Sequence, residues 1–577
     1  MTALHVSPVG ELAEPPTAAT RHLCAGVYVS EQFRDVVVGE VCTAPHRRVA
    51  PSYGFDIVPV MRHAWRAALL SAIPRIAMLA AVVVPALLGS LLAAVLVACG
   101  LAFLWRLRRL IALVVSDSRI TPPTRKRRRR VRAAKTWSFR EWLLGWKDPE
   151  KVREVKRFIG IAIALCATCL VLASASPEQA LLALCLSLAL GVIALAAGAA
   201  RQVQLNRIHR ASTLRPKRMS RRQRVADEQQ RHPCAVYRRP QHGGDEDDLT
   251  MFTLFGEESP FVGAGELVHQ WNPPMSVQLL RPSDEDAPLH EREHPTPPFQ
   301  AHELVEHLRK AVQELQSDNR EVRLPVQVRD RVYIAETDVS VDRDLLQGRI
   351  SDAEMHAIIN TPGVKQYHFL EIITPMAGSE LIATVLLRVN LQGRTLSLSS
   401  AACVLTRTPR SFQLAEEFGH NGTAAVALAA LRGVCSLPRE VGRSWRGVRY
   451  ICVVMKAALL PRDLTGSPIR NLLIGTRVSV REEPAQAWAK VQLEKTEILG
   501  HVKAIEQRLL RAVSDFLYSR DVDTSSFSDS ALKIINSGIF NIGDNNTFND
   551  NAVGNGAQVG AGGQQGDQKV PSGGGKQ

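Results

Sequence analysis

Residues 158–200 read FIGIAIALCATCLVLASASPEQALLALCLSLALGVIALAAGAA, a stretch whose single charged side chain is Glu178. A second apolar block, residues 67–104, has Arg75 as its single charged side chain. A helix needs about 20 apolar residues to cross the hydrocarbon of a bilayer, where backbone amides must be paired within a helix or a closed barrel. Both blocks are therefore expected to be helical and to lie in a membrane.

Each block contains a point at which a helix can turn back. Residues 174–179 (SASPEQ) interrupt the second block and predict helices near 158–174 and 180–200. The first block fits two interpretations, a hairpin that breaks at 85–90 or a single tilted span from 76 to 105. Basic residues before this block favour the hairpin, because they keep the preceding segment on the cytoplasmic side. Four spans are thus expected, and three remain the alternative.

The distribution of basic residues predicts the orientation. Residues 106–157 contain eighteen Lys or Arg and five Asp or Glu, and nine more basic residues follow within 201–224. Short loops rich in Lys and Arg remain in the cytoplasm. The expected protein is therefore a multi-pass protein of the cell membrane with its N- and C-termini in the cytoplasm.

The basic loop is also the expected site of lipid contact. Clustered Lys and Arg beside a span are attracted to anionic head groups, and tryptophans at helical spacing settle at the same level. Nucleic acid is the competing partner for such charge, but no recognisable nucleic-acid-binding fold accompanies the run, so this partner is not expected. The predicted lipid-contact residues are Arg125, Lys126, Arg127, Arg128, Arg129, Arg130, Trp137, Trp142 and Trp146.

The remainder of the chain predicts a soluble domain. A helix is expected at 302–315, strands are expected at 326–334, 367–373, 380–389 and 395–405, and the last two form a hairpin across 390–394. Further strands are expected at 448–455 and 472–480, followed by a long helix at 483–518. This pattern is typical of an α+β domain with an antiparallel sheet.

The expected fold class is thus an α-helical membrane region of two hairpins, a cytoplasmic α+β domain and a disordered C-terminal tail. The expected segments are an N-terminal cytoplasmic segment (1–65), the first hairpin (66–105), the basic loop with an interfacial helix (106–157), the second hairpin (158–200), a basic then acidic and Pro-rich linker (201–299), the α+β domain (300–521) and an Asn/Gly-rich tail (522–577).

Three short patterns resemble catalytic or binding motifs. His290–His294 matches the H-E-x-x-H string of zinc proteases, but prolines and acidic residues surround it, which favours a solvated linker. Gly263-Ala264-Gly265 lacks a third glycine and favours a turn. Glu416, Glu417 and His420 could form an acid/base cluster, although the Gly-flanked context indicates a loop. No catalytic, metal or cofactor-binding residue is assigned, and no cofactor is expected.

Several stretches carry a resemblance to known sequences. RHLCA at 21–25, RVAPSYGFDIVPV at 48–60 and PFVGAG at 260–265 with Trp271 soon after are similar to those of uncharacterised multi-span membrane proteins of high-GC actinomycetes. The resemblance covers most of the chain up to the tail. It implies location and organisation without implying an activity.

The tail alternates apolar residues with Asn and Gly between 534 and 559. Such segments can stack in register as cross-β strands. The core of this stretch resembles the amyloid signalling motifs related to the receptor-interacting-protein homotypic motif, and a flexible polar tail is the other interpretation. The residues expected to carry self-association are Ile539, Phe540, Asn541, Ile542 and Gly543.

These observations favour a membrane-anchored scaffold or sensor whose cytoplasmic domain binds an unknown protein partner, with a homo-oligomer formed through the tail. The alternative is a membrane-associated enzyme with an unrecognised pocket in 300–480.

Overall fold

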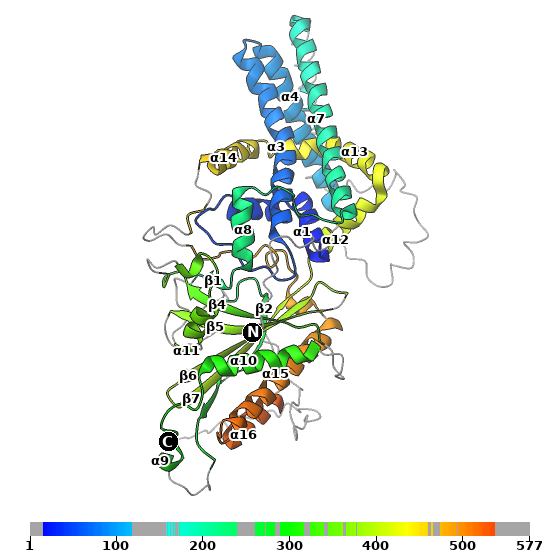
Figure 1. The fold of residues 1–577 in the computed structure, drawn as a ribbon. Helices are drawn as coiled ribbons and strands as arrows, with labels where there is room; N and C mark the ends of the chain where they lie inside the picture. The colour runs from blue at the N-terminus through cyan, green and yellow to red at the C-terminus, as the bar shows by residue number, and fades with distance from the viewer. Residues whose placement is uncertain are drawn as a thin grey trace, which may run out of the picture. The chain divides into compact units, whose positions relative to one another are not determined.

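A computed structural model describes residues 16–117, 176–238 and 260–536, together with scattered positions of 157–175. Within 260–536 the residues left out are 272, 283–288, 317–323, 340–343, 362–364, 377, 460–462, 466–473 and 492. The chain divides into two compact units (Figure 1). Unit 1 combines the chain up to Pro45 with Phe55–Asp227 and Thr408–Leu464, and unit 2 combines His46–Gly54 with Glu228–Arg407 and the chain from Thr465.

Unit 1 is helical. Asp56 caps the long helix α3, because its side chain accepts a hydrogen bond from the amide of Val58, and Pro177 occupies the first turn of α7, where a missing amide hydrogen is tolerated. The helices are α1 (Ala18–Val29), α2 (Glu31–Val36), the π-helix η1 (Val37–Cys42), α3 (Ile57–Leu87), α4 (Leu91–Asp117), α7 (Pro177–Arg210), α12 (Arg410–Glu417), the 3-10 helix η6 (Phe418–Asn421), α13 (Gly422–Val441) and α14 (Arg446–Leu459). Helix α8 (Arg221–Arg231) leads the chain from unit 1 into unit 2.

The first apolar block folds as two helices joined by a tight turn. A tight turn at 88–90 separates α3 from α4, so residues 76–105 are not one continuous helix. The described positions of 157–175 are helical, and α7 begins directly after the expected break. Of the described helices, α3 and α7 are long and apolar enough to cross a membrane, and α4 contributes a shorter apolar stretch, Leu91–Arg106.

Unit 2 is built on a mixed sheet. The strands are β1 (Cys234–Tyr237), β2 (Glu266–Gln270), β3 (Met275–Gln278), β4 (Gln327–Ala335), β5 (Gln366–Pro375), β6 (Ile382–Gln392) and β7 (Thr395–Leu405). Their order is β1-β4-β5-β6-β7-β2, and β3 also pairs with β7. Strand β1 is parallel to β4 and every other pairing is antiparallel. The sheet therefore confirms an α+β domain, and the strands expected between 326 and 405 are confirmed.

Helices cover one face of this sheet. The helices of this layer are α10 (Ala301–Gln313) with the 3-10 turn η4 (Glu314–Gln316), α11 (Asp352–Asn360), α15 (Leu493–Ser519) and α16 (Ser525–Asn536). Leu304 and Leu308 of α10 and Leu509 of α15 are fully buried in one core with Val385 and Leu387 of β6. The opposite face buries Phe261, Tyr333 and Phe369 in a second core. Because both faces are covered, the central strands are almost continuously apolar.

Three elements differ from the expected pattern. Residues 448–455 lie in helix α14 and are not a strand, because a short run of β-branched residues fits a helix as well as a strand until its packing partners are known. The long helix begins at Leu493, not 483. Residues 474–480 make an isolated bridge at Thr476 and no strand.

Folded structure also continues further than the expected start of the tail at 522. Helix α16 follows α15, and its Ile534 and Ile535 pack against the core beneath the sheet. The Lys503 Nζ of α15 donates a hydrogen bond to the Ile534 carbonyl at 2.8 Å. The tail motif at 539–543 therefore begins only after a packed helix.

Two glycines let α7 and α13 approach closely. A Cβ added to Gly198 would lie 2.5 Å from the Ala429 carbonyl oxygen, and Gly433 faces the Ala194 carbonyl in the same way. Small residues at such crossings allow helix backbones to come into contact. The crossing therefore depends on residues that carry no side chain.

Replacing Gly198 with valine is expected to destabilise unit 1 by about 1–3 kcal/mol, since the added side chain must push the two helices apart. Gly191→Val is the matched control, because it adds the same side chain to the same helix where nothing lies within 4 Å. The measurement is the thermal midpoint of the full chain in mild detergent. Equal midpoints for the two variants would contradict the close crossing.

Candidate functional site

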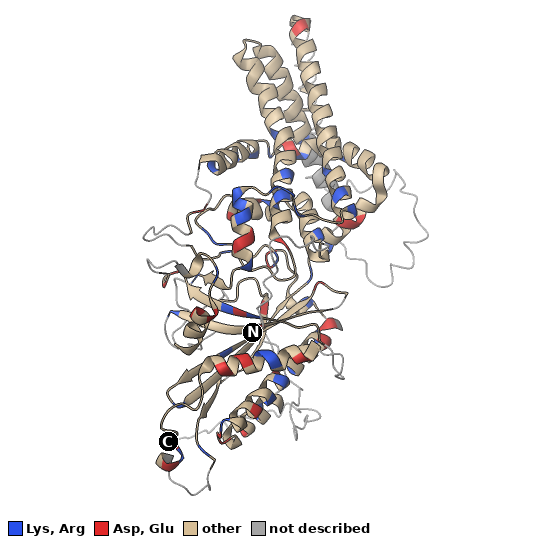
Figure 2. Ribbon diagram, viewed as in Figure 1, with Lys and Arg blue, Asp and Glu red and all other residues tan. Residues whose placement is uncertain are grey.

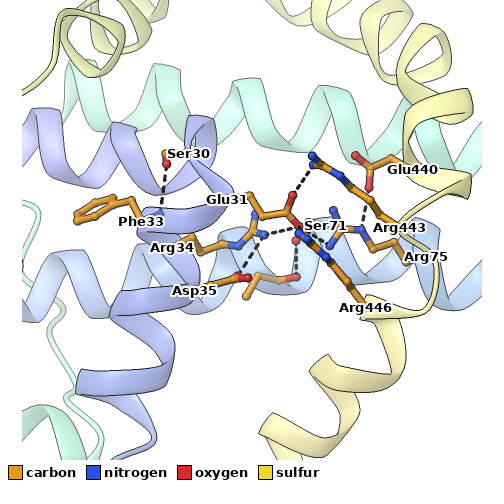
Figure 3. Close-up of polar contacts among 11 residues, drawn as sticks. Ser30, Glu31, Phe33, Arg34, Asp35, Ser71, Arg75, Glu440, Arg443 and Arg446 are labelled. Atoms are coloured by element: carbon orange, nitrogen blue, oxygen red, sulfur yellow. Dashed lines mark hydrogen bonds and ion pairs between the residues drawn. The ribbon is translucent and has the colours of Figure 1, made fainter. Parts of the chain in front are cut away.

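A cluster of charged side chains gathers around Arg75 in unit 1 (Figure 3). We call it the arginine–glutamate cluster. It draws on α2, α3, the end of α13, the following turn and α14, and consists of Glu31, Arg34, Asp35, Arg75, Glu440, Arg443 and Arg446. Figure 2 shows no charged residue where α3 and α4 meet at their turn, and one acidic residue at the start of α7.

Arg75 lies between two carboxylates. Its Nε is 2.7 Å from Oε2 of Glu440, and its Nη1 is 2.8 Å from Oε1 of Glu31. The side chain of Arg75 is 7% exposed, so its guanidinium, the last charged group of α3, is buried with paired charge. An uncompensated charge there would cost several kcal/mol, and the two glutamates remove that cost.

Glu31 is the shared acceptor of the cluster. Arg443 also pairs with it, and the Arg446 Nη1 lies 3.2 Å from its Oε1. Burial raises the pKa of Glu31, but the neighbouring Arg75, Arg34 and Arg443 outweigh burial and lower the pKa to about 2. The carboxylate therefore stays ionised near neutral pH. The cluster is suited to holding α2, α13 and α14 on α3, and it is not suited to proton transfer.

Sequence reasoning identified Arg75 but not its partners. Glu440 is 365 positions away along the chain, so no local pattern joins the two residues. The available signal was the presence of an arginine in an apolar helix, which requires an acidic partner somewhere in the fold.

The expected acid/base cluster is only partly assembled. Glu416 lies 2.8 Å from Nδ1 of His209 on α7, and the ring of His420 lies 6.0 Å from the His209 ring. Glu417 is exposed. Gly419 packs against the same turn of α7, where an added Cβ would meet His209 and the Leu205 carbonyl. These contacts hold the end of α12 and η6 against α7, so Glu416, His209 and His420 have a packing role within unit 1.

A second buried polar group lies within unit 2. Arg331 of β4 and Glu371 of β5 are 3% and 0% exposed, with Nη2 3.0 Å from Oε2. The Tyr53 hydroxyl donates to the other oxygen of Glu371, and Arg331 donates to the His232 carbonyl at 2.7 Å. Tyr53 belongs to the segment His46–Gly54, so residues that precede α3 in sequence complete the core of unit 2.

The PFVGAG stretch is explained by a neighbouring carboxylate. The amides of Gly263 and Gly265 donate to Oε1 of Glu482 at 2.8 and 2.7 Å. Both glycines have φ near +100°, and a Cβ on Gly265 would overlap the Val404 carbonyl. Burial raises the pKa of Glu482 to about 7 against the opposing effect of these two hydrogen bonds. The loop is a turn, as expected, that binds a side chain of the protein itself.

The zinc-protease string does not have the geometry of a catalytic helix. Helix α9 spans only Leu289–Arg292, so His294 lies beyond its end, and His290 is exposed. Within the parts of the chain that the structure describes, no group of three or more His, Cys, Asp or Glu side chains could hold a metal ion.

Two sets of expected site residues lie outside the described residues. The lipid-contact residues Arg125–Arg130 with Trp137, Trp142 and Trp146 fall within 118–150, and the self-association residues Ile539–Gly543 fall within 537–577. Both sets stay predictions.

Comparison with known proteins gives one match. No curated protein and no solved structure is significantly similar to the chain. The actinomycete resemblance and the amyloid-like tail motif stay predictions. The model of one protein family matches residues 270–549. This range contains β3–β7 and α10, α15 and α16 of unit 2, and also α12–α14 of unit 1. Residues 270–549 are thus covered by an AbeC-like domain.

Proposed function

We propose that the protein is a membrane-anchored scaffold or sensor. In this proposal α3, α4, residues 158–176 and α7 form the anchor, and the mixed-sheet unit is a cytoplasmic domain that binds a protein partner. Membrane lipids are the second partner, and contact between tails through Ile539–Gly543 stays a proposal.

The observation that carries the proposal is the exposed apolar surface of unit 1. Leu87, Leu88 and Leu91 at the turn between α3 and α4 are 80, 77 and 65% exposed. The most apolar 18-residue window of α7 is only 17% buried. Each such leucine gains about 1.5–3 kcal/mol when it leaves water, and soluble proteins rarely expose a continuous patch of this kind. A bilayer would cover all of it.

The orientation is inferred from charge. The turn at 88–90 and the interruption around Ser176 contain no basic residue, whereas α7 ends with Arg201, Arg207 and Arg210. Basic residues favour the cytoplasmic end of a span. Both of these points would then be external, and the chain after Arg201 would be cytoplasmic.

The enzyme alternative has less support. The buried charged pair Arg331–Glu371 is engaged with protein groups, and Asp330 of the same strand accepts from Arg309 and contacts His368. These ionisable side chains are paired with one another, whereas the ionisable side chains of a catalytic site must be available to substrate.

Cysteine labelling of the full chain in intact cells tests the proposal. Ser90→Cys places a thiol in the external turn, and Lys310→Cys places one on the exposed face of α10. An impermeant maleimide is expected to label Ser90→Cys in intact cells and Lys310→Cys only after lysis. The chain is also expected to remain in the membrane pellet in alkaline carbonate and to enter solution only with detergent.

The chain without added cysteine provides the background labelling. Labelling of Lys310→Cys in intact cells would overturn the orientation. Release of the chain by carbonate would overturn the anchor itself.

A further inference from the structure

Helix α14 presents apolar side chains to solvent along its length. Among its fourteen residues only Gly447 is buried. Trp445, directly before the helix, is 61% exposed. The exposed fractions of Val448, Ile451, Met455 and Leu459 are 53, 44, 56 and 79%. Exposed apolar side chains gathered in this way mark a site of contact with a partner or a membrane.

The exposed apolar side chains share a face. Positions 448, 451, 455 and 459 are separated by three or four residues, which places them on one side of a helix. Fourteen residues extend about 21 Å, so the apolar side forms a stripe along the helix.

The charges of α14 are of one sign. Arg446, Arg449 and Lys456 are its charged residues, and no Asp or Glu occurs between 446 and 459. A helix that combines an apolar stripe, basic residues and an adjacent tryptophan is typical of segments that lie in a membrane interface. Each Lys or Arg near an anionic surface adds to the attraction between the helix and the lipid phosphates.

The position of α14 in unit 1 fits such an interface. Gly447 packs against α3, where an added Cβ would lie 3.2 Å from Ile76 Cγ1 and 3.3 Å from the Cβ of Arg75. Arg446 joins the arginine–glutamate cluster through Glu31. Arg75 is the last charged residue of α3, and 76–87 are apolar. Helix α14 is therefore attached where the charged part of α3 ends, and it runs across α3 (Figure 1).

We propose that α14 is an interfacial helix that binds the anionic lipid surface of the inner leaflet. The apolar stripe enters the boundary between head groups and acyl chains, and Arg449 and Lys456 contact lipid phosphates. The cluster at Arg75 then sets the depth of the anchor by coupling this helix to α3. This proposal rests on the proposed membrane anchor.

The test measures the depth of a nitroxide on Cys452, an exposed residue of α14. The full chain is reconstituted in vesicles of phosphatidylcholine with 30–40% phosphatidylglycerol, roughly the composition that gives an anionic surface. Collisions with oxygen and with a water-soluble nickel chelate report whether the label lies in lipid or water. The cysteines replaced by alanine are Cys99, Cys166, Cys169, Cys185 and Cys435.

The nitroxide on Cys452 is expected to collide several-fold more with oxygen than with nickel. The same label on Lys310→Cys, with Cys452 replaced, is expected to show the reverse. Water-like accessibility at Cys452 in a chain that still requires detergent for extraction would overturn the interfacial helix and leave the anchor standing. Loss of membrane association would overturn both. Dipolar broadening between labels would show that a second copy covers α14, which also contradicts the proposal.

Charge reversal tests the recognition of lipid charge separately from the depth of the helix. Arg449→Glu with Lys456→Glu is expected to raise nickel accessibility at Cys452 in anionic vesicles, because the helix loses its attraction to phosphate. Reversal of Lys310 to Glu is the matched control and should have no effect. Equal depth in the double variant and the parent chain would contradict recognition of lipid charge.

Discussion

Arg331→Leu is expected to lower the free energy of unfolding of unit 2 by about 3–5 kcal/mol. The substitution leaves the fully buried carboxylate of Glu371 with the Tyr53 hydroxyl but without its cation. An uncompensated buried charge is far more costly than a lost contact, since it gains neither hydration nor pairing. The measurement is hydrogen exchange of peptides from β4 and β5 in the full chain, followed against denaturant.

Two further variants test the reason for this effect. Removing both charges in Arg331→Leu/Glu371→Leu is expected to be less damaging than Arg331→Leu alone, because no isolated charge remains. Arg329→Leu changes an exposed arginine on the same strand and should shift stability by no more than about 0.5 kcal/mol. A double variant that is less stable than Arg331→Leu would refute the electrostatic explanation.

Unit 2 is also expected to lose stability as the pH rises from about 4.5 to about 7. Burial raises the pKa of Glu482 to about 7, above its ordinary value of 4.5. The folded state therefore binds a proton that the unfolded state has already lost. The stability that unit 2 gains from this bound proton is fully present below pH 4.5 and disappears as the pH passes through 7. Its size is up to about 3 kcal/mol, since each pKa unit corresponds to about 1.4 kcal/mol.

Glu482→Gln is expected to flatten this pH dependence. The glutamine oxygen still accepts hydrogen bonds from Gly263 and Gly265, but the side chain does not ionise. Glu483→Gln changes the exposed neighbour and should leave the pH profile as in the parent chain. The profile is measured as the denaturant midpoint of unit 2 between pH 5 and 8 in one detergent. Parallel profiles for Glu482→Gln and the parent chain would count against a buried carboxyl that titrates near neutrality.

Local patterns in the sequence were sufficient for elements whose periodicity is unambiguous. The alternation and the Gly-containing turn at 390–394 predicted the β6–β7 hairpin, which pairs from Ile382–Leu405 to Gln392–Thr395. The apolar face of residues 302–315 predicted α10, since helical spacing leaves no strand interpretation. The apolar blocks and their breaks predicted the turn at 88–90 and the interruption at Ser176 before α7, because a proline or glycine among apolar residues marks where such a helix ends.

Other elements depend on partners that a local pattern cannot supply. Residues 448–455 fit a strand by composition. In the structure they belong to helix α14, whose Gly447 packs against α3. Helix α16 has only twelve residues, and its contacts with the core of unit 2 stabilise it. In both cases tertiary packing overrides a weak local preference.

The sequence by itself determined that this protein has two apolar helical blocks flanked by basic residues, and an α+β domain. These features depend on the number and spacing of apolar residues among near neighbours in the chain. Only the tertiary structure decided which charges meet. Arg75 pairs with Glu31 and Glu440, which are far apart in the sequence. Tyr53, which precedes α3 in the sequence, donates a hydrogen bond to the Glu371 carboxylate of the Arg331–Glu371 pair. Such pairs form because a buried charge must be compensated, and the fold, not the spacing along the chain, supplies the compensating group.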